Sequence, residues 1–188
     1  MNLAADRRAI LTYLLVTWTV SSLFYFLIIK SAGTNAASGA YTAGLMWCPA
    51  IGGLLTCKLL GRPVASLGWK WGQTRYQAAS YLIPPGYSTV AYSIAWLTGL
   101  AGLNPSQTGD AFSRYFGLGP LPLPAGIGLY FLVVASIGVI QNCATTLGEE
   151  IGWRGFLVPE LAKRFSFTGT AVLSGAIWAL WHVVAQAL

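Results

Sequence analysis

The sequence predicts an all-α, polytopic transmembrane helical bundle, and three observations support this prediction. Charged residues make up only 9% of the 188 residues, whereas soluble domains usually carry about 25%. Hydrophobic residues make up 55% of the chain, and the mean hydropathy is +0.61. These residues form long blocks instead of stripes at helical or strand spacing, which indicates that lipid surrounds them.

About five blocks are long enough to cross a bilayer, which takes ~20 apolar residues in a helix. Backbone polar groups in lipid must be satisfied within the segment, so we expect each block to be a helix. The alternating pattern of β-barrel strands is absent from the sequence. The predicted spans cover residues 9–29, 41–60, 78–103, 123–147 and 170–188.

The distribution of the net charge of +6 is better explained by membrane topology than by nucleic-acid binding. If the five spans alternate in direction, nine of the eleven Lys and Arg side chains lie on one side. The positive-inside rule then places the amino terminus and the second and fourth loops in the cytoplasm. We therefore expect a multi-pass protein of the cell membrane, in a bacterium the inner or plasma membrane, and no nucleic-acid partner. The nine cations are Arg7, Arg8, Lys58, Arg62, Lys70, Arg75, Arg154, Lys163 and Arg164.

We expect residues 1–188 to form a single membrane domain. Residues 1–77 hold two spans and a basic cytoplasmic loop, and residues 78–188 hold the other spans as a core. The fifth block stops at Leu188 with no flanking loop. We therefore expect the natural chain to continue and this core to be incomplete at its carboxyl end.

Three of the five acidic residues crowd into twelve positions, namely Glu149, Glu150 and Glu160. Ionisable residues at the end of a spanning helix are candidates for function. Arg154 follows Glu150 by four residues, which is the spacing of a helical ion pair. Neighbouring helical residues project about 100° apart, so Glu149 lies on a different face and is free to point elsewhere.

Polar side chains share the face of Glu149. Thr145 lies four residues before it and Asn142 seven residues before it, nearly in line along a helix. His182, which is the only histidine, lies in the fifth block with Trp178 four residues before it. Polar stripes on spanning helices are expected to face the bundle interior or a wet cavity. We therefore predict a shared polar pocket for Glu149 and His182, lined by Asn142, Thr145 and Trp178.

A carboxylate and an imidazole together offer acid–base chemistry. Glu149 can take a proton from water, while His182 orients that water or stabilises the developing oxyanion. A purely structural interpretation stays open from spacing alone. In that interpretation Glu150 and Arg154 form a structural bridge, and His182 is a hydrogen-bonded core residue.

Two motifs resemble those of the CPBP family, also called the Abi family, which comprises CAAX proteases and bacteriocin-processing enzymes. Residues 148–159 read GEEIGWRGFLVP and resemble its first motif, EExxxR. Residues 177–182 read IWALWH and resemble its second motif, FxxxH, with Trp178 in place of Phe. The gap of some thirty residues between the motifs also matches, and the resemblance covers residues 84–188.

The resemblance implies an intramembrane protease. The family includes type II CAAX prenyl endopeptidases, which cleave the last three residues from prenylated proteins, and bacterial members linked to bacteriocin maturation or self-immunity. By this resemblance, Glu149 activates the attacking water and His182 assists. Glu150 and Arg154 hold the site in shape.

One family motif is missing from the chain. It is a later histidine followed four positions on by an asparagine or similar residue, and it usually forms the oxyanion site. His182 is the only histidine, and Gln186 fits the pattern poorly. The chain is therefore either truncated before this motif or has lost part of the site, and such a fragment could be inactive.

No cofactor is expected. A catalytic zinc usually has three protein ligands and a water. Only Glu149, Glu150 and His182 could supply them, and Glu150 is expected to pair with Arg154. A metal held by Glu149 and His182, with zinc as the candidate ion, is the alternative.

The sequence therefore predicts an intramembrane endopeptidase that uses a glutamate-activated water. Its substrate would be a membrane-bound protein or peptide, prenylated or not, within the lipid bilayer. The first alternative is a non-catalytic protein of the same fold, such as an immunity factor or scaffold. The second is a small transporter in which Glu149, Arg154 and His182 relay protons.

Overall fold

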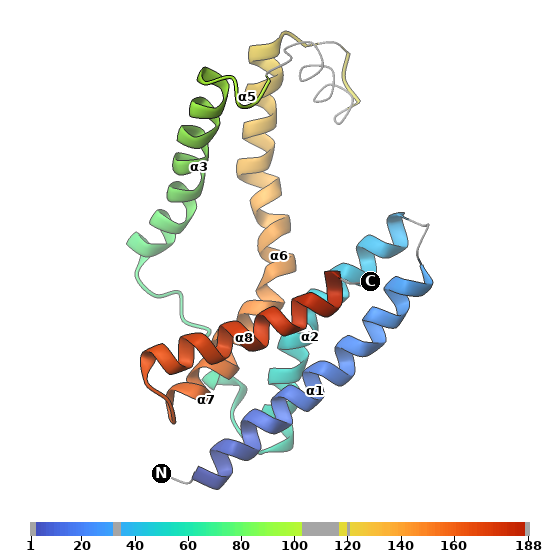
Figure 1. The fold of residues 1–188 in the computed structure, drawn as a ribbon, viewed down its shortest axis with the longest axis vertical. Coiled ribbons are helices and arrows are strands. Elements are labelled where there is room, and N and C mark those ends of the chain that lie inside the picture. Colours follow the sequence, from blue (N-terminus) through green and yellow to red (C-terminus); the bar gives the residue numbers. More distant parts are fainter. Residues whose placement is uncertain (1–2, 32–34, 103–116, 120, 187–188) are drawn as a thin grey trace. The chain divides into compact units, whose positions relative to one another are not determined.

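The computed structural model describes residues 3–31, 35–102, 117–119 and 121–186 (Figure 1). These described residues form helices and contain no strand, which confirms the predicted all-α class. They divide into two compact units. One unit consists of Met1–Trp69 and Gln141–Leu188, and the other of Lys70–Ile140.

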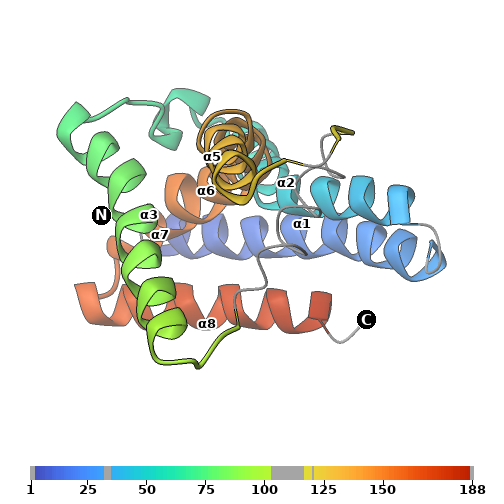
Figure 2. The same cartoon turned by 90° about the horizontal axis from the view of Figure 1, so that it is seen from above.

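The first unit is built on two long helices, α1 and α2, which pack side by side (Figure 2). The 3-10 turn η1, the end of α6, the π-helical segment η3, α7 and α8 complete it. The bounds are α1 Leu3–Lys30, α2 Asn35–Leu59, η1 Val64–Leu67, α6 Val139–Glu150, η3 Ile151–Leu157, α7 Val158–Ala162 and α8 Phe167–Gln186.

Two glycines four residues apart, Gly148 and Gly152, let α2 pack closely against α6 and η3. A Cβ atom at Gly148 would lie 2.6 Å from the Cα of Trp47, and one at Gly152 would lie 2.3 Å from the carbonyl carbon of Pro49. Small residues at this spacing allow helix backbones in membranes to approach each other. Glu149 lies between the two glycines and is thereby held against the interior of the unit.

An aromatic core joins α1 to η3 and α8. Tyr13 stacks on Phe156 with ring centroids 5.0 Å apart and meets the ring of Trp153 edge-on at 5.8 Å. Trp153 in turn meets Trp181 of α8 edge-on at 5.8 Å. Such aromatic pairs contribute ~0.5–1.5 kcal/mol each beyond the burial of their area. The helix that follows Glu149 is therefore fixed to α8 through buried rings.

Three helices among the described residues are long and apolar enough to cross a membrane: Asp6–Lys30, Gly39–Leu59 and Pro124–Ala162. They correspond, to within one residue at the ends of the predicted ranges, to the first, second and fourth predicted spans. The fifth predicted span overlaps a shorter apolar helix, Phe167–Val183, and residues 187–188 lie outside the described residues. The third predicted span, residues 78–103, is only partly helical: α3 (Thr74–Leu97) ends at Leu97, the described residues 98–102 are not helical, and residue 103 lies outside the described residues. Tyr, Ser, Thr and two prolines dilute the apolar residues of α3. For α3 and α8, membrane crossing stays a prediction.

The segment between the fourth and fifth predicted spans is helical over most of its length, as the spacing of Glu150 and Arg154 predicts for its first residues. Hydropathy falls after residue 147, but the chain stays helical to Ala162. Charged side chains are accommodated on this helix by ion pairs, Glu150 with Arg154 and Glu160 with Lys163. Only the turn of residues 163–166 separates α7 from α8.

The predicted basic side of the membrane corresponds to one end of the first unit. Arg62, which follows α2, pairs with Glu160 of α7 at 2.8 Å. Arg7 of α1 and Arg164, which follows α7, line the same cavity. The amino-terminal turns, Arg62 at the start of the second loop and the end of α7 therefore lie together.

The second unit contains α3, α5 (Leu123–Val133) and the π-helical segment η2 (Val134–Gly138). Within it, the Tyr81 hydroxyl of α3 donates a hydrogen bond to the carbonyl oxygen of Ala135. The predicted site residues all lie in the first unit.

Candidate active site

Glu149 lies one residue before the end of α6 and is buried, with 7% of its surface exposed. The chain passes from there directly into the π-helical segment η3, and π-helical turns are frequent at functional sites. A buried carboxylate is costly unless it is paired or hydrogen-bonded. Its partners therefore indicate what holds it in place.

Those partners come from α8, where Trp178 and His182 lie one helical turn apart. The Trp178 indole N–H donates to Glu149 Oε2 at 3.0 Å. The other carboxylate oxygen, Oε1, lies 3.9 Å from His182 Nε2. The rings of Trp178 and His182 also contact each other, with centroids 4.1 Å apart. The structure thus brings together Glu149, Trp178 and His182 from two helices.

The second nitrogen of His182 fixes the tautomer of its neutral ring. His182 Nδ1 lies 3.1 Å from the carbonyl oxygen of Trp178. A carbonyl oxygen only accepts hydrogen bonds, so Nδ1 carries the hydrogen in this contact. In the neutral imidazole the other nitrogen, Nε2, is then an acceptor. Glu149 Oε1 and His182 Nε2 therefore present two acceptors to the same small space.

Trp181 fixes α8 to α1 beside His182. Its indole N–H donates to Ser21 Oγ at 2.8 Å, and the Tyr25 hydroxyl donates to the Trp181 carbonyl oxygen at 2.8 Å. Trp181 also meets the His182 ring edge-on at 4.8 Å. Neither Ser21 nor Tyr25 was predicted from the sequence to support the site. The serine could have been predicted to face the other helices, because it is a polar residue within the first apolar block and polar residues in spanning helices face the bundle.

The other two predicted pocket-lining residues lie further back on α6. The Thr145 hydroxyl is half-buried and donates to the carbonyl oxygen of Asn142 at 2.9 Å, within its own helix. The Asn142 side chain is exposed. Trp178 is therefore the predicted pocket residue that contacts Glu149, while pocket-lining roles for Asn142 and Thr145 stay predictions.

The structure separates the two adjacent glutamates. Glu150 pairs with Arg154 on the outer side of the helix, where the two side chains are 47% and 68% exposed. Exposed pairs of this kind contribute ~0–1 kcal/mol to stability. Glu149, in contrast, is buried against α8.

Metal ligands around Glu149 are few. Among the described residues, no group of three or more His, Cys, Asp and Glu side chains is placed to hold a metal ion. Glu149 and His182 supply two ligands, and Glu150 is paired with Arg154. A catalytic zinc usually takes three protein ligands, so these two residues alone would leave its ligand set short by one.

Comparison with known proteins bears on both motifs. Residues 122–188 match the family of type II CAAX prenyl endopeptidases described as Rce1-like. A stretch of 34 residues is 44% identical to CAAX prenyl protease 2 of Methanococcus maripaludis, covering 18% of this chain and 12% of that relative. No solved structure matches the chain. The predicted family resemblance is therefore confirmed, and residues 122–188, which contain both motifs, are similar to the type II CAAX prenyl endopeptidases.

Proposed function

We propose that this protein is an intramembrane endopeptidase that hydrolyses a peptide bond in a membrane-associated protein or peptide. The observation that carries the proposal is the meeting of Glu149 and His182, one from each family motif, with 3.9 Å between Oε1 and Nε2. The name of the matched relative, CAAX prenyl protease 2, supports prenylated peptides as the substrate class. The protein would act in the cell membrane, in a bacterium the plasma membrane.

The space between Glu149 and His182 suits a bridging water. Their 3.9 Å separation is too long for a direct hydrogen bond. A water with hydrogen bonds of ~2.8 Å to both atoms has an angle of about 90° at its oxygen, near the angle between its O–H bonds. Both partners are acceptors, so both O–H groups of the water donate. The oxygen lone pairs are then left for a substrate carbonyl carbon.

Peptide hydrolysis follows from this arrangement. As the water oxygen bonds to the substrate carbonyl carbon, Glu149 takes one proton and a tetrahedral oxyanion forms. His182 Nε2 holds the other hydrogen of the water and so orients the attack. When the C–N bond breaks, Glu149 returns its proton to the leaving nitrogen. The products are a free amine and a carboxylic acid, and Glu149 is ionised again.

Trp178 acts in this scheme as a positioning residue. Its N–H holds Glu149 Oε2, which turns Oε1 toward His182. A phenylalanine, which the family motif has at this position, can stack on His182 but cannot donate this hydrogen bond.

The test is a cleavage assay with the full-length protein in liposomes. The substrates are a peptide that carries a farnesylated cysteine before its last three residues and the same peptide without the lipid. We expect release of the terminal tripeptide from the farnesylated peptide, and a loss of about 10²-fold or more in His182→Ala. Failure to cleave either peptide, or unchanged cleavage by His182→Ala, would contradict the proposal. Equal cleavage of both peptides would support the proposed peptide hydrolysis but contradict a preference for prenylated substrates.

A further inference from the structure

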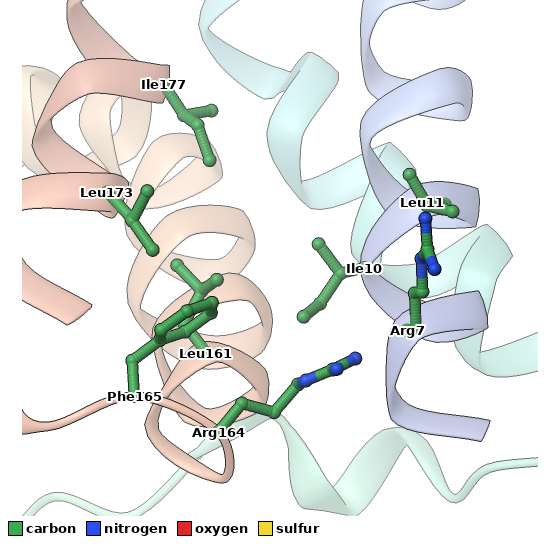
Figure 3. Close-up of a pocket in the computed structure, with 8 residues that line it drawn as sticks. All are labelled: Arg7, Ile10, Leu11, Leu161, Arg164, Phe165, Leu173 and Ile177. Carbon is green, nitrogen blue, oxygen red and sulfur yellow. The ribbon is translucent and has the colours of Figure 1, made fainter. Parts of the chain in front are cut away.

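A cavity of about 320 Å³ lies at the basic end of the first unit (Figure 3). Neither Glu149 nor His182 lines it. Two of its eight lining residues are charged, Arg7 and Arg164, and both are cationic. The other six are apolar: Ile10, Leu11, Leu161, Phe165, Leu173 and Ile177.

The cavity opens where α1 faces α7 and α8. Ile10 points from α1 toward Leu161 and Leu173 across the space, and Arg164 reaches from the turn after α7 toward α1 (Figure 3). The hydrogen bonds that join α1 to α8 lie further along α1, at Ser21 and Tyr25. The cavity therefore lies on the amino-terminal side of these bonds.

Arg7 lies at the end of a membrane-length helix, because it is the second residue of the apolar helix Asp6–Lys30. Arg164 lines the same small cavity as Arg7 and therefore lies at the same level. Long cationic side chains at such ends extend into the lipid headgroup layer. The arginines therefore lie at headgroup level, and the apolar wall of the cavity extends from them toward the acyl chains.

We propose that this cavity binds one anionic phospholipid, with its phosphate between Arg7 and Arg164 and an acyl chain against the apolar wall. Two guanidinium groups on one small cavity repel each other, and a phosphate compensates both charges with bidentate hydrogen bonds. Each guanidinium has five N–H donors, so a contact of Arg164 within the chain leaves donors for the lipid. The volume is at the low end of small-molecule sites, ~300–1,000 Å³, and suits the phosphate and the upper part of a chain.

Other anions match this surface less well. A small hydrated anion gains nothing from the six apolar side chains, because only apolar surface benefits from their burial. A zwitterionic lipid brings a further cation to a cavity whose two charged lining residues are both cationic. An anionic phospholipid fits both the charge and the apolar wall.

The test is lipid titration of the full-length protein in a neutral detergent at physiological salt, with bound lipid counted by native mass spectrometry. Detergent removes the surface potential by which vesicles attract every basic residue. We expect phosphatidylglycerol to bind about tenfold more tightly than phosphatidylcholine with the same chains, and Arg7→Gln and Arg164→Gln each to weaken it about tenfold. Arg8→Gln is the matched control, because it removes the same charge one residue away and does not line the cavity.

A cavity-filling variant separates the apolar wall from the charge. Leu173→Trp keeps both arginines, and we expect it to weaken phosphatidylglycerol binding as well. Equal binding of both lipids, equal losses in Arg8→Gln and Arg7→Gln, or unchanged binding by Leu173→Trp would each overturn the proposal. Displacement of phosphatidylglycerol by an equal concentration of glycerol phosphate would also overturn it, because the ligand would then be free phosphate. These outcomes do not depend on peptide cleavage.

Discussion

Replacing Trp178 by phenylalanine removes one hydrogen bond from the candidate active site and keeps its aromatic packing. The indole N–H donates to Glu149 Oε2 at 3.0 Å, and the ring lies 4.1 Å from that of His182. Phenylalanine keeps an aromatic face for His182 but has no donor. The carboxylate of Glu149 then stays buried without the group that sets its orientation.

The size of the effect follows from the type of bond and its exposure. Hydrogen bonds to charged groups contribute ~1.5–3 kcal/mol. Trp178 is 44% exposed, so water replaces part of the lost bond and the lower end, ~1.5 kcal/mol, applies. If this loss appears in the transition state, kcat falls about tenfold. KM changes little, because the lost bond is to Glu149 and not to the substrate.

The assay is steady-state peptide cleavage in liposomes with kcat and KM measured separately. Trp69→Phe is the matched control, because it loses an indole hydrogen bond of 2.8 Å to the carbonyl oxygen of Val64, outside the site. We expect Trp69→Phe to keep the wild-type kcat. A Trp178→Phe enzyme whose kcat stays within about twofold of wild type would refute the positioning role.

Three further predictions concern metal dependence, the outer ion pair and helix packing. Treatment with a zinc chelator should leave cleavage unchanged, because the proposed mechanism gives the proton transfers to Glu149 and uses no metal; inactivation that added zinc reverses would show the opposite. Arg154→Gln should lower the unfolding free energy by no more than ~1 kcal/mol, because its ion pair with Glu150 is exposed. Thermal unfolding in detergent measures this change, and a larger loss of stability would show that the ion pair supports the fold. Gly152→Ala should destabilise by ~1–3 kcal/mol or more through overpacking against α2. Gly175→Ala, where a Cβ atom meets nothing within 4 Å, is its control, and equal thermal midpoints for the two variants would refute close packing.

Hydropathy and spacing predict much of this architecture. Long apolar blocks predict α1 and α2 because helix is the conformation that satisfies backbone groups within one segment in lipid. The polar stripes predict that Glu149 and His182 face inward, and the structure brings them within 3.9 Å. The first inference rests on the length and hydropathy of each block, and the second on periodicity within each helix; both signals are local in sequence.

What sequence reasoning missed depends on contacts between distant segments. The bonds of Ser21 and Tyr25 to Trp181 join residues 156–160 positions apart, and local periodicity does not specify such a partner. The spacing of Glu150 and Arg154 predicts a helix past residue 147, but not its continuation to Ala162, because charged residues lower the hydropathy there. The spacing of Gly148 and Gly152 was a readable signal for close helix packing, but it does not identify α2 as the partner.

The most direct test of the central claim is the single-turnover rate of Glu149→Gln. The amide keeps the shape of the side chain but cannot take a proton from water, so we predict a fall of about 10²–10⁴-fold. Glu160→Gln is the control, because it neutralises a buried carboxylate that pairs with Arg62 and Lys163; it should lower stability but keep the rate per folded molecule. A folded Glu149→Gln protein that cleaves its substrate at the wild-type rate would contradict the account.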